Sequence, residues 1–320
     1  MPNFREPVTM DDLERYAAQH LDKNAFDYFS SGSGDDVTLH ENRQAFKRIK
    51  LRPRMLRNVS HQDISVTVLG HKLSMPICVF THSLSGNGAS RRRTGHSQSG
   101  EFHGHSYGSE SILYKQSGRP YGKHKGRANF LLPGHLEFAN FLSLKKKKGF
   151  RNNGELGYYI GSLLDSSVDW ETFDWLRSIT SLPFVVKGIY TAEDARLAVQ
   201  HGAQGILVSN HGGRQLDGVP ATIEVLAEIA EAVRGTGVEV YMDGGVRLGT
   251  DVLKALALGL ERCLLDGLLS GDLLTRESKG VTKVLQMLRD ELKVAMALAG
   301  CASLKDITPS LVMRHAASHL

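Results

Sequence analysis

The sequence predicts an α/β protein with the (β/α)8 TIM-barrel fold, and two observations support this prediction. Between residues 182 and 265, short apolar segments alternate with helix-like segments at a spacing of roughly 20–35 residues, which is typical of βα units in a parallel sheet. Three successive strands are also followed directly by polar residues, namely Lys187, the run 209–214 and the run 243–247. The carboxyl ends of all strands in a barrel share one face, so this single fold accounts for all three placements.

The first 79 residues carry clear secondary-structure signals. Apolar residues at helical spacing and alternating apolar residues indicate two helices and two strands, over 11–22, 25–29, 64–68 and 74–79.

The middle of the chain has a different composition. Residues 85–111 are rich in Ser, Gly, His and Arg, and Phe102 and Tyr107 are the only large apolar side chains there. Little apolar surface is therefore available to offset the chain entropy of this segment. We expect 80–153 to be largely irregular, with the barrel incomplete around 80–120.

From residue 182 onward the alternation of strands and helices is regular. The predicted strands are 182–187, 205–208, 238–242 and 262–265, and the predicted helices are 191–200, 221–233, 250–258 and 281–299. The first of these helices begins at Thr191, and Asp194 three residues later completes a capping-box pattern. We treat residues 1–320 as one barrel domain.

Composition narrows the class of protein. An apolar fraction of 41% and a charged fraction of 23% are ordinary for a globular domain. The net charge of +5 suits small anionic ligands and does not indicate a nucleic-acid partner. No run approaches the roughly 18 apolar residues of a membrane span. No metal site is predicted, because the cysteines lack ligand spacing and His96, His103 and His105 lie in the polar tract.

The run Ser-Asn-His-Gly-Gly-Arg-Gln-Leu-Asp at 209–217 is the most informative segment. Its two glycines allow a tight turn and a close approach to a ligand. His211 suits general acid–base catalysis because imidazole titrates near neutral pH, and Arg214 offers a planar fork for a carboxylate. The pair predicts a site for a small acid, although a loop histidine and a surface arginine would give the same pattern.

Two further groups follow neighbouring strands. Lys187 is predicted to point into the barrel mouth, where an ammonium group stabilises developing negative charge, and an exposed strand-end lysine is the alternative. The second group is the turn Asp243, Gly244, Gly245, Val246 and Arg247. A glycine turn beside a cation and before a helix is a candidate phosphate cradle. Paired glycines also occur in ordinary turns.

Six segments match one known family: 26–32, 52–59, 74–79, 182–188, 206–221 and 243–259. The run at 209–217 is highly specific to that family. On these segments the chain resembles the FMN-dependent L-2-hydroxy-acid oxidases, the glycolate oxidase group. The resemblance covers roughly residues 10–79 and 154–259 and resumes near residue 279.

The resemblance implies a barrel that holds FMN at its carboxyl face, and it implies a role for each candidate residue. Tyr28 and Arg214 bind the substrate, and His211 is the base that takes a proton from the 2-hydroxy acid. Lys187 stabilises the reduced flavin, and Ser209 contacts it. The remaining cofactor contacts are His211, Asp243, Gly244, Gly245, Val246 and Arg247. Dioxygen reoxidises the flavin and yields H2O2.

The last three residues, Ser318, His319 and Leu320, fit the small-basic-leucine form of a peroxisomal targeting signal. Peroxide-forming chemistry agrees with that compartment. We therefore expect recognition by the peroxisomal import receptor, and the resemblance implies a homotetramer.

The resemblance is interrupted twice. Unrelated polar sequence occupies 80–119, and Asp266-Gly267 stands where the family carries a Gly-Arg pair. We interpret both interruptions as altered reading frame or exon choice. Two alternatives to an oxidase stay open: a catalytically inactive relative that acts as an interaction partner, and a phosphate-binding barrel isomerase or synthase.

Overall fold

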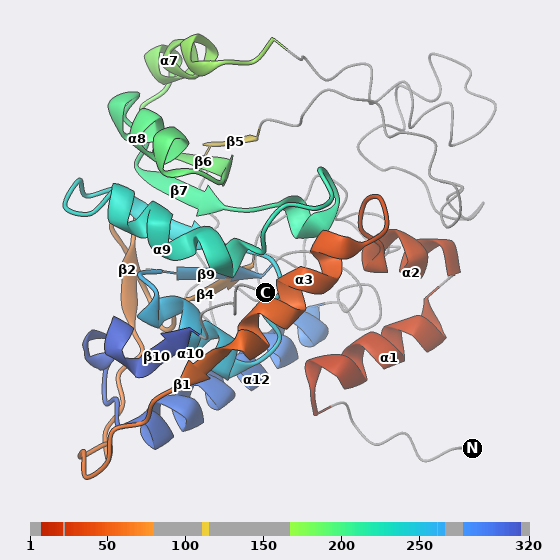
Figure 1. Ribbon diagram of the computed structural model, residues 1–320, viewed down its shortest axis with the longest axis vertical. Helices are drawn as coiled ribbons and strands as arrows, with labels where there is room; N and C mark the ends of the chain where they lie inside the picture. The colour runs from red at the N-terminus through yellow and green to blue at the C-terminus, as the bar shows by residue number, and fades with distance from the viewer. Residues whose placement is uncertain are drawn as a thin grey trace, which may run out of the picture.

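The computed structural model describes residues 8–21, 23–79, 111–114, 167–260, 262–265 and 278–314. At its centre lies a six-stranded parallel sheet with the order β4-β9-β8-β7-β6-β5 (Figure 1). The strands are β4 (Ile77–Val79), β5 (Ser111–Tyr114), β6 (Phe184–Ile189), β7 (Gly205–Val208), β8 (Glu239–Met242) and β9 (Arg262–Leu265). From β5 to β9, strands consecutive in the chain are neighbours, and the first strand, β4, pairs with the last, β9. Consecutive parallel strands with the first beside the last are the order found in a (β/α)8 barrel, and among the described residues β4 and β5 are the two ends of the sheet.

The central strands are buried on both faces, as expected of a parallel sheet covered by helices. Alternate residues enter two separate apolar clusters. The smaller cluster consists of Val185, Leu207 and Tyr241, and it lies on the interior face of the sheet. A Cβ at Gly205 would come within 2.6 Å of the Tyr241 ring, so the glycine provides the space that this ring fills.

A hairpin closes the amino end of the sheet. Strands β2 (Val66–Val68) and β3 (His71–Leu73) pair antiparallel through a turn in which Leu69 and Gly70 both have positive φ. The N–H of Leu69 donates to Glu239 Oε1 at 2.9 Å, at the start of β8, and Leu69 packs against the interior cluster. The opposite, carboxyl end of the strands is the end where barrel active sites form.

Helices cover the outer face of the sheet. They are α7 (Trp170–Ile179), α8 (Ala192–Gln200), α9 (Thr222–Ala232), α10 (Gly249–Ala257) and α12 (Ser278–Ala299). Figure 1 shows α8 and α9 beside β6 and β7, whereas α12 lies beside α10. The 22-residue α12 buries Leu285, Leu288, Leu292 and Met296 completely, at the spacing of one helical face.

The amino-terminal segment forms three helices and is fastened to the carboxyl-terminal segment. The helices are α1 (Met10–His20), α2 (Lys23–Ser30) and α3 (Val37–Arg48). Strand β1 (Ile49–Leu51) continues from α3 and pairs antiparallel with β10 (Val312–Arg314). Short 3-10 turns occur at η2 (His211–Gly213), η3 (Leu304–Asp306) and η4 (Pro309–Leu311).

Most predicted elements are present with small shifts in their ends, including α1, α2, β4 and every predicted strand and helix after residue 182. The sequence did not predict α3, β1, β3, α7 or β10. Within 80–153, predicted to be largely irregular, residues 111–114 form β5 and pair in register with β6. The rest of that segment lies outside the described residues, and barrel incompleteness around 80–120 stays a prediction. None of the described helices has the length and apolar composition of a membrane span.

Candidate active site

The carboxyl ends of β6, β7 and β8 carry the polar residues that the sequence analysis selected. Lys187 lies within β6, Ser209 directly follows β7, and Asp243 directly follows β8. All three are buried, with exposed fractions of 4%, 4% and 0%. Buried polar groups are retained only when they are hydrogen-bonded or paired. The hydrogen-bond and ion-pair partners of these three side chains therefore show how the site is built.

Lys187 and Asp243 form a buried ion pair. The Lys187 Nζ lies 2.6 Å from Asp243 Oδ2, and both side chains are almost fully excluded from solvent. Lys187 is two residues past Val185, and Asp243 is two past Tyr241, so both share the interior face of the small apolar cluster. The pair fixes an ammonium group at the carboxyl end of the barrel, as predicted for Lys187, with Asp243 as its counterion.

The turn after β7 has an unusual backbone. His211, Gly212 and Gly213 have φ values of 57°, 65° and 75°, and His211 is the non-glycine residue among them. Two hydrogen bonds hold the turn: the His211 N–H donates to Ser209 Oγ at 3.1 Å, and the Gly213 N–H donates to Asn210 Oδ1 at 3.1 Å. Left-handed non-glycine residues persist where surrounding contacts determine them, and they cluster at functional sites.

An amide pair fixes this turn to α3. Asn42 and Asn210 exchange two side-chain hydrogen bonds, at 3.0 and 2.7 Å, and both residues are buried. The Asn210 amide also donates to the Tyr190 hydroxyl at 3.0 Å, which in turn donates to the Pro220 carbonyl at 2.5 Å. Burial raises the pKa of Tyr190, which keeps the hydroxyl protonated as a donor.

The segment between α2 and α3 lies against the same turn. The Ser33 N–H donates to the Gly213 carbonyl at 2.8 Å, and Arg214 Nη1 makes a long contact of 3.5 Å with the Ser31 carbonyl. Tyr28 lies in α2, three residues before Ser31. The structure therefore brings the helix that carries Tyr28 to the loop that carries His211 and Arg214, although the Tyr28 side chain is outside what is described.

Asp217, at the end of the 209–217 run, binds the amino end of α3. Its carboxylate accepts the N–H groups of Asp35, Val37 and Thr38 at 2.9, 3.3 and 2.8 Å. The N–H of Gly218 donates to Thr38 Oγ1 at 2.9 Å. A single carboxylate thus connects the loop after β7 with the helix that follows the α2–α3 loop.

The turn after β8 packs closely against α3. Gly244 and Gly245 have φ values of 93° and 79°, and a Cβ at Gly245 would lie 2.0 Å from the Asn42 carbonyl oxygen. The N–H of Arg247 donates to Asp251 Oδ2 at 3.1 Å, as does that of Leu248 at 3.0 Å. These two N–H groups precede α10 and already donate to Asp251, so the Arg247 side chain is the stronger candidate for an anion contact. Burial raises the pKa of Asp251.

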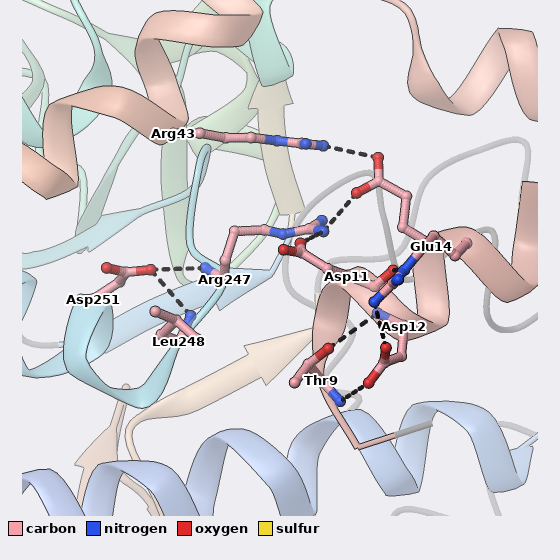
Figure 2. A network of polar contacts seen from close by, with 9 residues as sticks. Thr9, Asp11, Asp12, Glu14, Arg43, Arg247, Leu248 and Asp251 are labelled. Atoms are coloured by element: carbon pink, nitrogen blue, oxygen red, sulfur yellow. Dashed lines mark hydrogen bonds and ion pairs between the residues drawn. The ribbon is translucent and has the colours of Figure 1, made fainter. Parts of the chain in front are cut away.

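Part of the Arg247 guanidinium has no hydrogen-bond partner among the described residues. Figure 2 shows it reaching α1, where its Nη2 donates to Asp11 at 2.6 Å and to Glu14 at 2.5 Å. Its Nε and Nη1 are buried and have no hydrogen-bond partner among the described residues. Nε carries one N–H and Nη1 carries two, so three buried donors are left for an acceptor. This donor set fits the phosphate of FMN, and Arg247 would hold it.

Several residues of the site were not predicted. Asn42, Tyr190 and Thr222 are remote in sequence from the motifs, and the Thr222 hydroxyl donates to the Asp243 carbonyl at 2.6 Å. Asn210 and Asp217 belong to the predicted run, but nothing local pointed to their partners. Among the described residues no cluster of three His, Cys, Asp or Glu side chains could hold a metal ion, and His96, His103 and His105 lie outside them.

Buried cations at the carboxyl end of a parallel α/β barrel suit the binding of an anionic ligand. The family model described as FMN-dependent dehydrogenase matches residues 17–98 and 119–314. The chain belongs to this family, whose cofactor is FMN, and its fold is the α/β TIM barrel predicted from the sequence.

Curated relatives align over nearly the whole chain. Human (Homo sapiens) 2-hydroxyacid oxidase 1 is 40% identical over an alignment of 360 residues, which covers 96% of this chain and 97% of that protein. Spinach (Spinacia oleracea) glycolate oxidase is 39% identical and covers 95% of each. The family model also matches residues 80–98, 119–153 and 260–278, in which we had found no resemblance to the family. Residues 99–118 are not matched.

Solved structures agree with this assignment. The crystal structure of mandelate oxidase superposes with a TM-score of 0.77 at 31% identity and covers 94% of this chain and 97% of that chain. The flavin-binding domain of baker's yeast flavocytochrome b2 gives a TM-score of 0.72 at 27% identity, with 96% and 86% covered.

Proposed function

We propose that this protein oxidises a small (S)-2-hydroxy acid of the glycolate or lactate type to the 2-oxo acid, with O2 reduced to H2O2. The family supports flavin-dependent oxidation of a 2-hydroxy acid. The main support for the proposal is a contact at the carboxyl end of the barrel. There the loop that contains His211 and Arg214 is hydrogen-bonded to the segment between α2 and α3. A small acid is then held between an arginine and a base.

The roles of the residues follow from their chemistry. Arg214 binds the substrate carboxylate through its planar guanidinium, and Tyr28 assists from α2. His211, in its fixed turn, accepts a proton from the hydroxy acid as that acid loses two electrons and two protons in all. The buried Lys187 ammonium stabilises negative charge that develops at the barrel mouth.

FMN supplies the two-electron acceptor that the side chains of the chain lack. The residues proposed to hold it are Lys187, Ser209, His211, Asp243, Gly244, Gly245, Val246 and Arg247. Of these, Arg247 has three buried donors that suit a phosphate, and Lys187 is a buried cation.

The test is peroxide formation by the purified chain loaded with FMN, with glycolate and L-lactate as substrates. His211→Gln removes the base, and we expect a fall in kcat of about 10²–10⁴-fold. Arg214→Lys keeps the charge but not the fork, so KM should rise. His201→Gln is the matched control, because His201 pairs with Asp174 on the outer face. Equal activity in the wild type and His211→Gln would refute the proposal.

The same experiment decides between the oxidase and its alternatives. A chain that binds FMN but does not oxidise any 2-hydroxy acid would be an inactive relative with an interaction role. Binding of a sugar phosphate without FMN would favour an isomerase or synthase, which the match to an FMN-dependent family opposes.

We also propose import into peroxisomes through Ser318, His319 and Leu320, which lie outside the described residues. A fluorescent protein fused to the amino terminus should colocalise with a peroxisomal marker, and deletion of Leu320 should leave it diffuse. A punctate pattern that survives the deletion would argue against this signal.

A homotetramer is the assembly that we propose. Light scattering after size-exclusion chromatography of the FMN-loaded protein measures the mass directly. A mass near that of the 35.2 kDa chain would contradict it.

A further inference from the structure

The ion pairs of Arg247 join two parts of the chain that local sequence does not connect. Asp11 and Glu14 lie three residues apart on one face of α1, and both accept from the same Nη2 of Arg247 (Figure 2). Glu14 also accepts from Arg43 Nη2 on α3 at 3.0 Å. The amino-terminal helix is thereby anchored on the arginine whose Nε and Nη1 donors have no partner among the described residues.

We propose that Asp11 and Glu14 are positioning residues that couple docking of α1 to binding of the FMN phosphate. They hold Nη2 of Arg247 and leave the Nε and Nη1 donors without a partner among the described residues. A phosphate on those donors then orders the guanidinium, and the ordered guanidinium holds α1. This inference rests on the assignment of Arg247 to the phosphate, and it goes beyond it in making α1 part of the cofactor site.

Asp11 and Glu14 affect phosphate binding at Arg247 in two opposite ways, and the larger effect decides whether they strengthen or weaken it. The carboxylates repel a phosphate, but they also fix the guanidinium. The Asp11 side chain is 76% exposed, so its charge is screened by water. Arg43 balances the charge of Glu14, and the four groups sum to zero: two arginines and two carboxylates. Net repulsion is therefore small, and fixing the arginine dominates.

Glu14 contributes more than Asp11. Its side chain is 21% exposed and Arg247 is 10% exposed, so their hydrogen bond lies in a less hydrated region than that of Asp11. The Asp11 bond still affects that carboxylate, because its hydrogen bond with Arg247 lowers the pKa of Asp11 despite partial burial. Loss of Glu14 should therefore weaken the coupling more.

The first test measures FMN affinity from the quenching of FMN fluorescence, without turnover. Glu14→Gln should weaken FMN binding about tenfold, and riboflavin, which lacks the phosphate, should bind within about twofold of wild type. Glu41→Gln is the matched control, because it removes the exposed ion pair of Glu41 with Arg48 and touches no residue of the site. Unchanged or tighter FMN binding by Glu14→Gln would overturn the proposal.

The second test follows α1 itself by hydrogen exchange, and it stays informative if Glu14→Gln folds poorly. In the wild type, FMN should slow exchange of the amides in residues 10–20, whereas riboflavin should not, because coupling is reciprocal. FMN that binds without changing α1 exchange would refute the coupling. Absence of any FMN binding by the wild type would instead refute the cofactor site, so the two failures are distinguishable.

Discussion

Asp217 caps a helix from which it is separated by 179 residues, since its Oδ1 accepts the N–H of Thr38 in the first turn of α3 at 2.8 Å. Asp36, the residue at the N-cap position, has a left-handed backbone (φ 61°) and makes no side-chain capping bond. A residue of the loop after β7 therefore caps α3. The position of α3 therefore depends on the position of this loop, and the position of the loop depends on α3.

Asp217→Ala should therefore affect both stability and substrate binding. Loss of a helix cap costs about 1–2 kcal/mol, which urea unfolding measures. KM for the hydroxy acid should rise more than kcat falls, because the α2–α3 segment that faces Arg214 loosens. Asp35→Ala is the control: Asp35 is exposed, and only its backbone N–H takes part in the contact. Equal stability of the two variants would contradict the capping role.

The Asp217 cap also predicts a pH dependence. Burial raises the pKa of Asp217, but the hydrogen bonds from Thr38, Asp35 and Gly218 outweigh it, so the net shift is downward from 3.8. A carboxyl with a lowered folded-state pKa stabilises the fold above its unfolded pKa, and this stabilisation is lost as pH falls through the folded value. The difference in urea midpoint between wild type and Asp217→Asn should be constant near neutral pH and shrink below about pH 4. A difference that grows on acidification would contradict it.

Elements with local signals could be predicted, and α3 shows why others could not. The helix α8 begins where Thr191 accepts the N–H of Asp194, a signal contained within four residues. The strand β7 is a continuous apolar run, and β6 begins with three apolar residues. In contrast, the start of α3 is capped by Asp217, so its signal lies elsewhere in the chain.

The same distinction applies to the site. His211, Arg214 and Lys187 could be selected because ionisable residues beside glycines or at strand ends are visible in the sequence. The pairs Lys187–Asp243 and Asn42–Asn210 span 56 and 168 residues, and they meet only because β6 and β8 both flank β7 and because α3 packs on the η2 turn. The sequence therefore singled out candidate groups, whereas the pairing of Lys187 with Asp243 and of Asn42 with Asn210 could be found only in the structure.

The Lys187–Asp243 pair should be sensitive to the loss of one partner. Lys187→Met leaves a buried carboxylate without its cation, which costs about 3–5 kcal/mol of folding free energy. The double variant Lys187→Met/Asp243→Leu should recover much of that loss but remain inactive, because the cation is gone. Arg234→Ala, which breaks an exposed pair with Glu231, should cost at most about 1 kcal/mol. Thermal or urea unfolding of the three variants measures these differences, and a double variant no more stable than Lys187→Met would contradict a net charge penalty.

Substitution of Gly213 tests whether the contact with α3 positions the η2 turn. A Cβ at this residue would lie 2.6 Å from the backbone N of Leu39, and φ is 75°. Neither partner of that contact is a flexible side chain, so Gly213→Ala must displace the η2 turn or α3. We expect a higher KM for the hydroxy acid together with a loss of stability.

Gly218→Ala separates the clash from the backbone strain in this comparison. Gly218 has a φ of 82°, and a Cβ at this residue would meet no atom within 4 Å, so alanine there introduces strain alone. The left-handed conformation costs roughly 1–2 kcal/mol at either residue. The additional loss in Gly213→Ala, measured by urea unfolding and by KM, then reports the contact with Leu39. If both alanine variants lose the same stability and keep the same KM, the close approach of η2 to α3 does not position His211 and Arg214.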